Sequence, residues 1–408
     1  ALLQAFSRFL ITSLAPVFYN VGIIFGIVFL TPKFGILGLA YGIILGAFLH
    51  LLIQLPSLYN IGFMPLQGIN FKDAGLRKVF KLWLPRTIGL AALQINGIIV
   101  TSIASFLAAG SIAVFNLADN LRFVPIGIFG VAFSTAAFPA MSLAYARGQN
   151  NLFLKRFSLA VRQTLFIVIP LSLLFFVFRA QIVRIILGTG QFDWNATRLT
   201  AAVLGIFSFG IFASAILPIF TRIFFIFHNT KTPVFINIVS AAINMLLSFL
   251  LVSIFIKFPF LSHALADFLK VGDMNGVAVL GLPLAFTISS IISIFWYWFV
   301  LKRHVGDFGI SEIKKSVAKI ILASFVSIAF AYCGLYVLNN IFDTKTFLGL
   351  FFQTSGAFGM AIAAYLAVAF ILKSEEILVL NMPATLFNWR GIKKPEPVPA
   401  GESLDDQY

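Results

Sequence analysis

Residues 35–55 read GILGLAYGIILGAFLHLLIQL and contain no Asp, Glu, Lys or Arg. An α-helix needs roughly 20 apolar residues to cross the hydrocarbon core of a bilayer, so this stretch is long enough to span a membrane. Comparable runs recur along the chain, among them SLAPVFYNVGIIFGIVFL at 13–30 and FSLAVRQTLFIVIPLSLLFFVF at 157–178. Their repetition predicts a chain that crosses the membrane many times.

The composition excludes a water-soluble domain. Hydrophobic residues make up 60% of the chain and charged residues 11%, and the mean hydropathy is +1.00. Continuous apolar runs favour helices, because the strands of a membrane barrel would alternate at every second residue. We therefore predict an all-α integral membrane protein, a polytopic helical bundle. It has about ten spans, near residues 15–30, 35–56, 83–108, 112–143, 153–178, 197–227, 233–256, 276–301, 316–338 and 347–372.

The formal net charge of +15 follows the predicted topology. Seventeen basic residues lie in the links after the second, fourth, sixth and eighth spans and in the C-terminal tail, and seven lie in the opposite links. By the positive-inside rule the first set faces the cytoplasm. This distribution favours contact with membrane lipids over binding of nucleic acid. Cys333 is the only cysteine and the four histidines are far apart in sequence, so we expect neither an intramolecular disulfide nor a metal cluster.

Four arginines fall within predicted spans: Arg86, Arg122, Arg162 and Arg222. A charge inside a bilayer is costly unless it faces a partner or a wet cavity, which makes such residues functional candidates. Arg122 lies about 16 Å along its predicted helix, near mid-membrane. Asp119 is three residues earlier, on the same helix face, so the two can pair. We expect this face to border a hydrated interior.

Each arginine also has a purely structural alternative. The pair of Asp119 and Arg122 could simply brace neighbouring helices. Arg222 is near a cytoplasmic helix end, where its side chain could reach the interface, and Arg162 has the position of an interfacial anchor. Arg86 follows a proline at a helix start, where a cation gains nothing from the helix dipole, and this favours a ligand-binding role.

An internal repeat suggests two lobes. The segment APVFYN at 15–20 recurs as TPVFIN at 232–237, and each copy opens a span that a Gly-rich span follows. Parallel repeats in transporters indicate two lobes with a substrate site between them. Pro16 and Pro233 are 217 positions apart. Matching lobes would therefore require roughly 130 residues, about four helices, before Ala1.

Several of these segments, in this order, resemble the MurJ (MviN) lipid II flippases of the multidrug/oligosaccharidyl-lipid/polysaccharide exporter superfamily. The resemblance extends to about residue 301. It rests on SLAPVFYN, GLAYGIILGAFLHLLIQLP, LWLPRTIGLAALQIN, ASFLAAGSIAVFNLADNL, PIGIFGVAFSTAAFPAMS, GTGQFDWNAT and NTKTPV.

The resemblance implies a fourteen-helix exporter fold with two lobes around a cationic cavity, here lacking its first helices. It divides the chain into residues 1–62, a remnant of the first lobe with the end of helix 4 and helices 5–6; residues 63–301, the second lobe with helices 7–12; residues 302–372, helices 13–14; and residues 373–408, a largely disordered cytoplasmic tail. It implies transfer of lipid II, the undecaprenyl-diphosphate-linked peptidoglycan precursor, between leaflets of the bacterial inner membrane without covalent chemistry.

Two departures from the family pattern bear on the site. Many members carry an Asp-Arg pair followed by a Glu, where this chain has Asp119, Asn120 and Phe123, with Arg122 moved to another position. Some members resemble a sodium-binding pattern with two carboxylates, and the aligned positions here are Val100 and Ser248. Asn244 and Thr287 of the sodium-binding pattern are retained, so a coupling cation of unknown identity stays an option. We expect no other cofactor.

The substrate-binding candidates are thus Arg122, Asp119, Asn120, Arg86 and Arg222, and the ion-site candidates are Asn244, Ser248 and Thr287. The alternatives are an exporter of another lipid-linked oligosaccharide or drug in the same superfamily, and a membrane-embedded lipid-diphosphate enzyme. The second is disfavoured because the 14 acidic residues are scattered. No P-loop pattern is present in the sequence, so we expect the membrane potential and not ATP hydrolysis to drive transport. We also expect the protein to be a monomer.

Overall fold

The computed structural model of the chain describes residues 9–60, 94–188 and 192–377, together with positions 3, 87, 91 and 190. These residues contain helices and no strand, and nine helical segments are long and apolar enough to cross a membrane. The prediction of an all-α polytopic bundle is confirmed. Of the predicted span at 83–108, residues 94–105 are helical, and most of the preceding part lies outside the described residues.

The chain divides into two compact units, Ala1–Leu82 and Trp83–Tyr408. The expected lobe boundary at residue 62 falls outside the described residues and stays a prediction. The described helices of the first unit are α2 (Phe9–Phe25), a π-helical turn (Gly26–Leu30), α3 (Thr31–Phe34), α4 (Ile36–Leu52) and α5 (Leu55–Tyr59).

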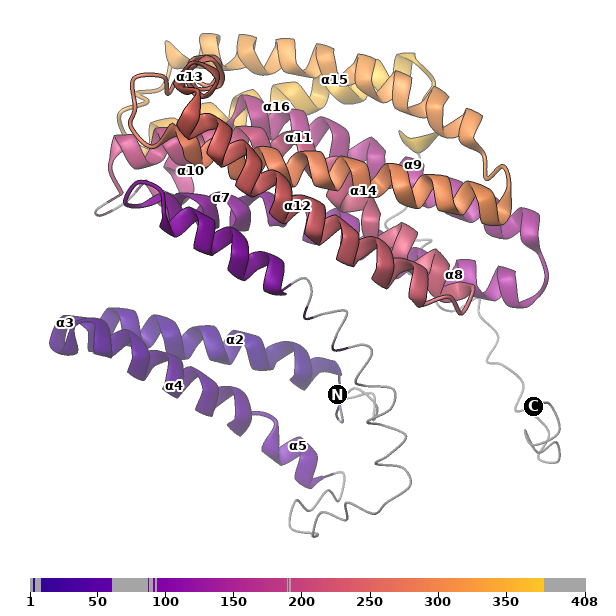
Figure 1. The fold of residues 1–408 in the computed structure, drawn as a ribbon, viewed down its shortest axis with the longest axis horizontal. Coiled ribbons are helices and arrows are strands. Elements are labelled where there is room, and N and C mark those ends of the chain that lie inside the picture. The colour runs from indigo at the N-terminus through magenta and orange to yellow at the C-terminus, as the bar shows by residue number, and fades with distance from the viewer. Residues whose placement is uncertain are drawn as a thin grey trace. The chain divides into compact units, whose positions relative to one another are not determined.

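Helices α2 and α4 pack closely against each other because glycines face each other across the interface (Figure 1). A Cβ atom added to Gly22 of α2 would overlap the Cα of Gly46 in α4. No side chain fits in that space, so the two backbones are in direct contact. Such small-residue interfaces replace the hydrophobic effect in lipid, where close van der Waals packing drives helix association.

The second unit is a bundle arranged around one long central helix, α11 (Trp194–Ile226), which packs against α7, α8, α9 and α14. Asp193 caps this helix by accepting a hydrogen bond of 2.7 Å from the backbone N–H of Ala196. The remaining elements are α7 (Ser111–Pro125), a π-helical turn (Ile126–Val131), α8 (Ala132–Ala146), α9 (Asn150–Val177), α10 (Arg179–Leu187), α12 (Lys231–Lys257), α13 (Pro259–Phe268), a 3-10 turn (Val277–Leu280), α14 (Gly281–Val305), α15 (Ile310–Asn339) and α16 (Phe347–Ile371).

The last two helices form a pair that packs on α9 (Figure 1). Ser327 of α15 donates a 2.8 Å hydrogen bond to the carbonyl of Ala361 in α16. The hydroxyl of Tyr365 donates a 2.7 Å bond to the carbonyl of Phe166 in α9. Residues 375–377 then form a further helical turn, and Glu376 is buried. The described residues thus reach five positions into the segment 373–408 that we expect to be a tail; residues 378–408 lie outside the described part, and this boundary stays a prediction.

Candidate functional site

Arg122 lies in the last turn of α7 and is 8% exposed. Its Nε donates a 2.7 Å hydrogen bond to Oδ1 of Asp119, and its Nη2 pairs with the same oxygen. The carboxylate is less enclosed, because the Asp119 side chain is 38% exposed. The predicted pairing of these two residues is therefore present, with the cation inside and the anion at the edge.

Two aromatic rings complete the surroundings of Arg122. Its guanidinium carbon is 3.7 Å from the ring centroid of Phe286 in α14 and 4.6 Å from that of Phe207 in α11. The two rings meet edge to face, with centroids 5.6 Å apart. The cation therefore occupies the corner between them, where the electron-rich ring faces stabilise it. This contact ties α7 to α11 and α14 and corresponds to the bracing role that we set beside substrate binding.

Asn120 does not join this group. It is exposed, like Phe123, whereas Leu121 and Arg122 are buried. Asn120 and Arg122 thus lie on different faces of α7, because residues two apart on a helix are separated by about 200° around its axis. A ligand held by Arg122 would not meet the Asn120 side chain on the same face.

The helix that carries Arg122 changes its winding directly after the site. Pro125 ends α7, and Ile126–Val131 form a π-helical turn before α8 begins. A Cβ atom at Gly130 would lie 2.5 Å from the carbonyl oxygen of Ala215 in α11. Proline and π-turns are recognised causes of helix bending. The helix that carries Arg122 therefore has an irregular turn at Ile126–Val131 that is pressed against α11 and at which it can bend.

Arg222 lies near the C-terminal end of α11, where its side chain contacts α8. Its Nη2 donates a 2.8 Å hydrogen bond to Oγ1 of Thr135, and its guanidinium is 5.7 Å from the ring centroid of Phe138. Thr135 lies 13 residues beyond Arg122, about 20 Å along the helical path. The structure does not bring the two arginines together. Arg86, the remaining candidate, lies outside the described residues.

The three ion-site candidates share no hydrogen-bond partner. Nδ2 of Asn244 donates a 3.0 Å hydrogen bond to Oδ1 of Asn96 in the helix 94–105. Oδ1 of Asn244 and Oγ of Ser248, one turn apart on α12, are buried without a hydrogen-bond partner. Thr287 instead donates a 3.1 Å bond to the carbonyl of Ile206.

This donor set does not fit a carboxylate-based cation site. Asn244 and Ser248 offer two neutral oxygens, and the position aligned with the other family carboxylate is Val100, which is buried. Within the described ranges, no group of three or more His, Cys, Asp or Glu residues could hold a metal ion. Hard cations in proteins prefer several oxygen ligands, usually with carboxylates among them. The geometry therefore gives no basis for a step that depends on a bound cation.

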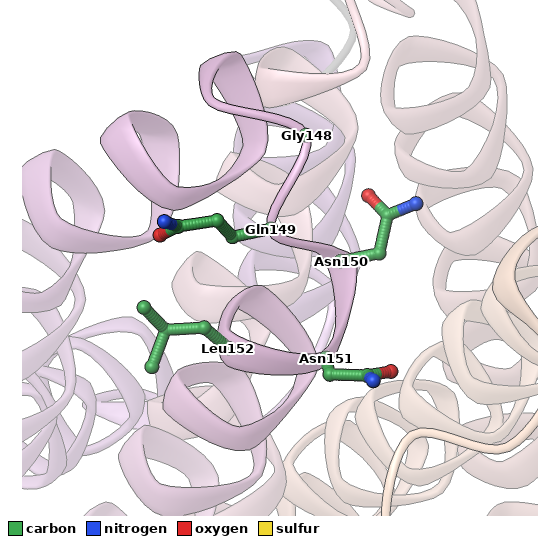
Figure 2. A pocket seen from close by; sticks show the side chains of 5 residues that line it. All are labelled: Gly148, Gln149, Asn150, Asn151 and Leu152. Carbon is green, nitrogen blue, oxygen red and sulfur yellow. The ribbon is translucent and has the colours of Figure 1, made fainter.

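A surface hollow of about 390 Å³ lies over the turn between α8 and α9 (Figure 2). It is lined by Gly148, Gln149, Asn150, Asn151 and Leu152. Figure 2 shows the side chains of Gln149 and Leu152 on one side of this turn and those of Asn150 and Asn151 on the other. None of these residues is charged, so the hollow does not supply the cationic environment expected for a diphosphate.

Sequence reasoning did not identify four partners of the candidate residues: Phe207 and Phe286 around Arg122, Thr135 beside Arg222, and Asn96 beside Asn244. Asn96 carries a detectable signal, because an amide inside an apolar helix needs a hydrogen-bond partner. The two phenylalanines carry none, since the chain has 49 of them.

Comparison with known proteins agrees with this architecture. The family model described as "Lipid II flippase MurJ" matches residues 1–355. A probable lipid II flippase MurJ from Buchnera aphidicola subsp. Schizaphis graminum is 26% identical over 384 residues, which cover 92% of this chain and 70% of that protein. A lipid II flippase MurJ from Burkholderia cenocepacia is 28% identical over 268 residues, covering 64% of this chain and 51% of the relative. The chain therefore spans only part of the length of these relatives.

A solved structure shows the same fold. The structure titled "Lipid II flippase MurJ, inward closed conformation" aligns with a TM-score of 0.69 and 23% identity, covering 91% of this chain and 69% of the other. The family match extends over most of the sequence, from α2 through α15 and into the first part of α16. On these grounds the chain is a multi-pass membrane protein that belongs to the lipid II flippase MurJ family.

Proposed function

We propose that the protein transfers lipid II from the inner to the outer leaflet of the bacterial inner membrane by alternating exposure of a polar path, without covalent chemistry. The observation that carries this proposal is the family match over residues 1–355. The charged groups inside the spanning helices α7 and α11 support it, because buried cations are expensive in lipid and persist where they serve a function.

The physical problem is the passage of a diphosphate and sugars through hydrocarbon. These groups lose their hydration in an apolar medium, at a cost of several kcal/mol for each unsatisfied polar group. Guanidinium groups can replace water by donating paired hydrogen bonds to phosphate oxygens. A path that presents arginines at different depths would lower the barrier along its length.

Arg222 is the described candidate most ready to receive a phosphate. It donates a hydrogen bond to the neutral hydroxyl of Thr135, and none of the ion pairs in the described part of the chain includes it. Its positive charge is thus not offset by a carboxylate. The side chain is also half-buried, so it remains accessible while it is partly shielded from water.

Arg122 would act differently, because Asp119 and two rings already surround it. A phosphate could bind there only by displacing the carboxylate of Asp119, which is the exposed member of the pair. In this role Asp119 holds the guanidinium in place between transport events. The π-helical turn that follows supplies a point at which α7 and α8 can bend relative to each other.

The energy source in this proposal is the membrane potential, which supplies about 2.3 kcal/mol per elementary charge per 100 mV. Vesicles with an imposed potential should therefore flip lipid II faster than depolarised vesicles. Equal rates would argue against this energy source. We further propose that the protein acts as a monomer, which its detergent-corrected mass would test.

The deciding experiment uses the full gene product that contains this sequence, reconstituted in vesicles with fluorescent lipid II. The appearance of the label in the opposite leaflet should be faster than in protein-free vesicles. Arg222→Gln should slow transfer by about tenfold, the loss expected for one charged contact to the transferred group. Arg303→Gln is the matched control, because Arg303 is exposed and lies over Phe299, and it should keep the normal rate.

Two results would contradict the proposal. Transfer no faster than in protein-free vesicles, by protein with normal helicity, would remove the flippase function. Equal transfer of an undecaprenyl-diphosphate oligosaccharide without a peptide would favour the alternative, an exporter with a broader choice of lipid-linked sugars.

A further inference from the structure

A second hollow, of about 510 Å³, lies where α14 ends and α15 begins. It is lined by Lys302 from the last turn of α14, by Asp307 from the connection, and by Ile310, Ser311, Lys314 and Lys315 from the start of α15. The hollow therefore gathers three ammonium groups from two helices that are joined by a short loop. It is separate from both arginines discussed above.

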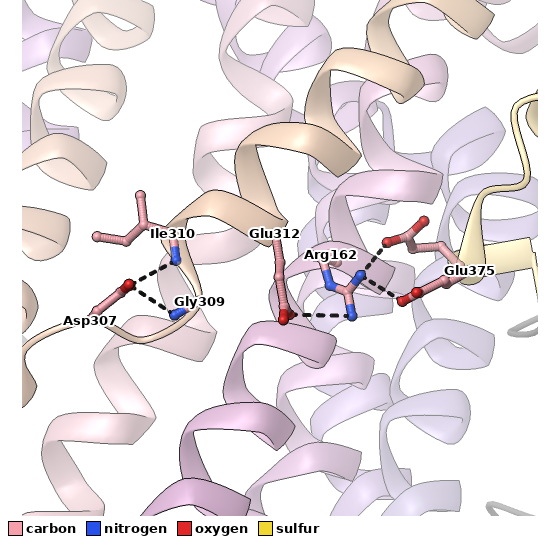
Figure 3. Close-up of polar contacts among 7 residues, drawn as sticks. Arg162, Asp307, Gly309, Ile310, Glu312 and Glu375 are labelled. Carbon is pink, nitrogen blue, oxygen red and sulfur yellow. Dashed lines mark hydrogen bonds and ion pairs between the residues drawn. The ribbon is translucent and has the colours of Figure 1, made fainter.

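The loop that shapes this hollow is fixed in place. Phe308 is 1% exposed, and its ring centroid is 4.9 Å from that of Trp298 and 5.5 Å from that of Phe157. Asp307 accepts hydrogen bonds of 3.1 Å from the backbone N–H groups of both Gly309 and Ile310 (Figure 3). The carboxylate thus caps α15.

Arg162 of α9 pairs with three glutamates near the start of α15. Arg162 of α9 donates hydrogen bonds of 3.1 Å to Glu375 and 3.0 Å to Glu376, and its Nη2 lies 4.0 Å from Glu312 of α15 (Figure 3). Figure 3 shows Glu312 extending toward Arg162. The acidic residue nearest in sequence to the lysines of α15 is therefore engaged elsewhere.

The three lysines are consequently uncompensated. In the described part of the chain, none of the ion pairs within 4.0 Å involves Lys302, Lys314 or Lys315. The lining carries three positive charges against one carboxylate, and that carboxylate is used in capping α15. The hollow thus presents net positive charge, as a site for a phosphate group would.

The position of the hollow favours a lipid over a soluble anion. Val277–Val305 and Ile310–Asn339 are both candidate membrane spans, and the hollow lies between the end of the first and the start of the second, where a membrane surface would meet them. Cationic hollows between spanning helices at the membrane surface are typical binding places for anionic lipid headgroups. Lysine side chains at helix ends reach naturally to this depth.

Apolar side chains continue from the lysines toward the membrane interior. On α14, Phe299 and Phe295 follow Lys302 at helical spacing and are 51% and 70% exposed. On α15, Ile321 and Phe325 follow Lys314 in the same way and are 40% and 62% exposed. Residues three, four and seven apart share a helix face. Each helix thus offers a cation for a phosphate and an apolar stripe for an acyl chain.

We propose that this basic hollow binds the phosphodiester headgroup of an anionic phospholipid, with the acyl chains along the exposed stripes of α14 and α15. The bound lipid would be a resident of the membrane and would occupy a site distinct from the transport path. The site is independent of the proposed flippase activity, which could fail while this binding persists.

The test compares two triple variants of the full protein in detergent micelles, with fluorescent phosphatidylglycerol as the probe. Lys302→Gln/Lys314→Gln/Lys315→Gln removes the charges of the hollow. The matched control, Lys257→Gln/Lys270→Gln/Lys345→Gln, removes three lysines from the links assigned to the opposite membrane face.

The hollow variant should bind the probe at least about tenfold more weakly, since each lysine near a membrane surface contributes a several-fold effect on binding of anionic lipid. The control should stay within about twofold of the unmodified protein. High salt should weaken binding to the unmodified protein, because the groups are exposed to screening. Equal loss in both triple variants would overturn the proposal, as it would show an unspecific charge effect.

Two further arms distinguish the source of the phosphate. Phosphatidylcholine should not displace the probe, and millimolar inorganic phosphate should displace little of it, because it lacks the acyl chains. Complete displacement by inorganic phosphate would overturn the lipid assignment. If the triple variant loses helicity, the single variant Lys314→Gln serves instead, with an expected several-fold loss, and unchanged binding by a folded single variant would contradict the proposal.

Discussion

Replacing Asp119 and Arg122 together should destabilise the protein by less than the sum of the two separate replacements. In the single variant Asp119→Asn, a guanidinium that is 8% exposed loses its anionic partner. Leaving a buried cation without its partner costs about 3–5 kcal/mol when the pair is fully enclosed. Asp119 is 38% exposed, so solvent already weakens the pair, and we expect about 1–2 kcal/mol here.

The variant Arg122→Met should cost a similar amount for a different reason. It removes two cation–aromatic contacts, worth about 0.5–2 kcal/mol each, but the thioether can fill the corner between Phe207 and Phe286. Asp119 then keeps its access to solvent. In the double variant no charge remains buried without a partner, so its cost should be below the sum of the two single costs by about 1 kcal/mol.

The measurement is a double-mutant cycle of unfolding in mixed detergent micelles, followed by circular dichroism. The exposed pair of Arg198 and Asp273 is the control, and its coupling should be smaller because water screens both groups. Strictly additive costs at Asp119 and Arg122 would refute the reasoning that the pair braces α7. Lost lipid II transfer in a variant of unchanged stability would instead assign Arg122 to substrate binding.

Three further predictions concern local packing and pH. Gly130→Val should destabilise the protein by about 1–3 kcal/mol, because its Cβ would lie 2.5 Å from the carbonyl oxygen of Ala215. Gly127→Val is the control in the same unfolding assay. It should cost less, because a Cβ at that position would have a side chain at 3.5 Å as its nearest neighbour. Tyr365→Phe removes a 2.7 Å hydrogen bond to α9 and should cost about 1 kcal/mol, so an unchanged unfolding midpoint would argue against that contact. The hydrogen bond from Arg198 lowers the pKa of Asp273 from the ordinary 3.8. The unmodified protein should therefore be more stable than Asp273→Asn above pH 3.8, and this difference in stability should vanish as the pH falls through the lowered pKa. A difference in stability that persists in strong acid would contradict the pairing.

Much of the site was predictable only as residue types. Spacing along one helix placed Asp119 beside Arg122, because residues three apart always share a face. The same regularity separated Asn120 from Arg122. The aromatic corner around Arg122 was not predictable, since Phe207 and Phe286 come from helices that are distant in sequence. Likewise, nothing in the sequence indicated that the partner of Arg222 would be Thr135 rather than a carboxylate.

The sequence by itself determined that this chain is a helical membrane protein and where its spans lie, because the bilayer requires every spanning segment to be apolar and to satisfy its own backbone hydrogen bonds. It also determined the family, through motifs that keep their order. Only the tertiary structure decided which charges are compensated. Arg162 pairs with three carboxylates, and none of the ion pairs found among the described residues includes Lys302, Lys314 or Lys315. Pairing of this kind depends on which helix ends meet, and hydropathy along one chain carries no information about that.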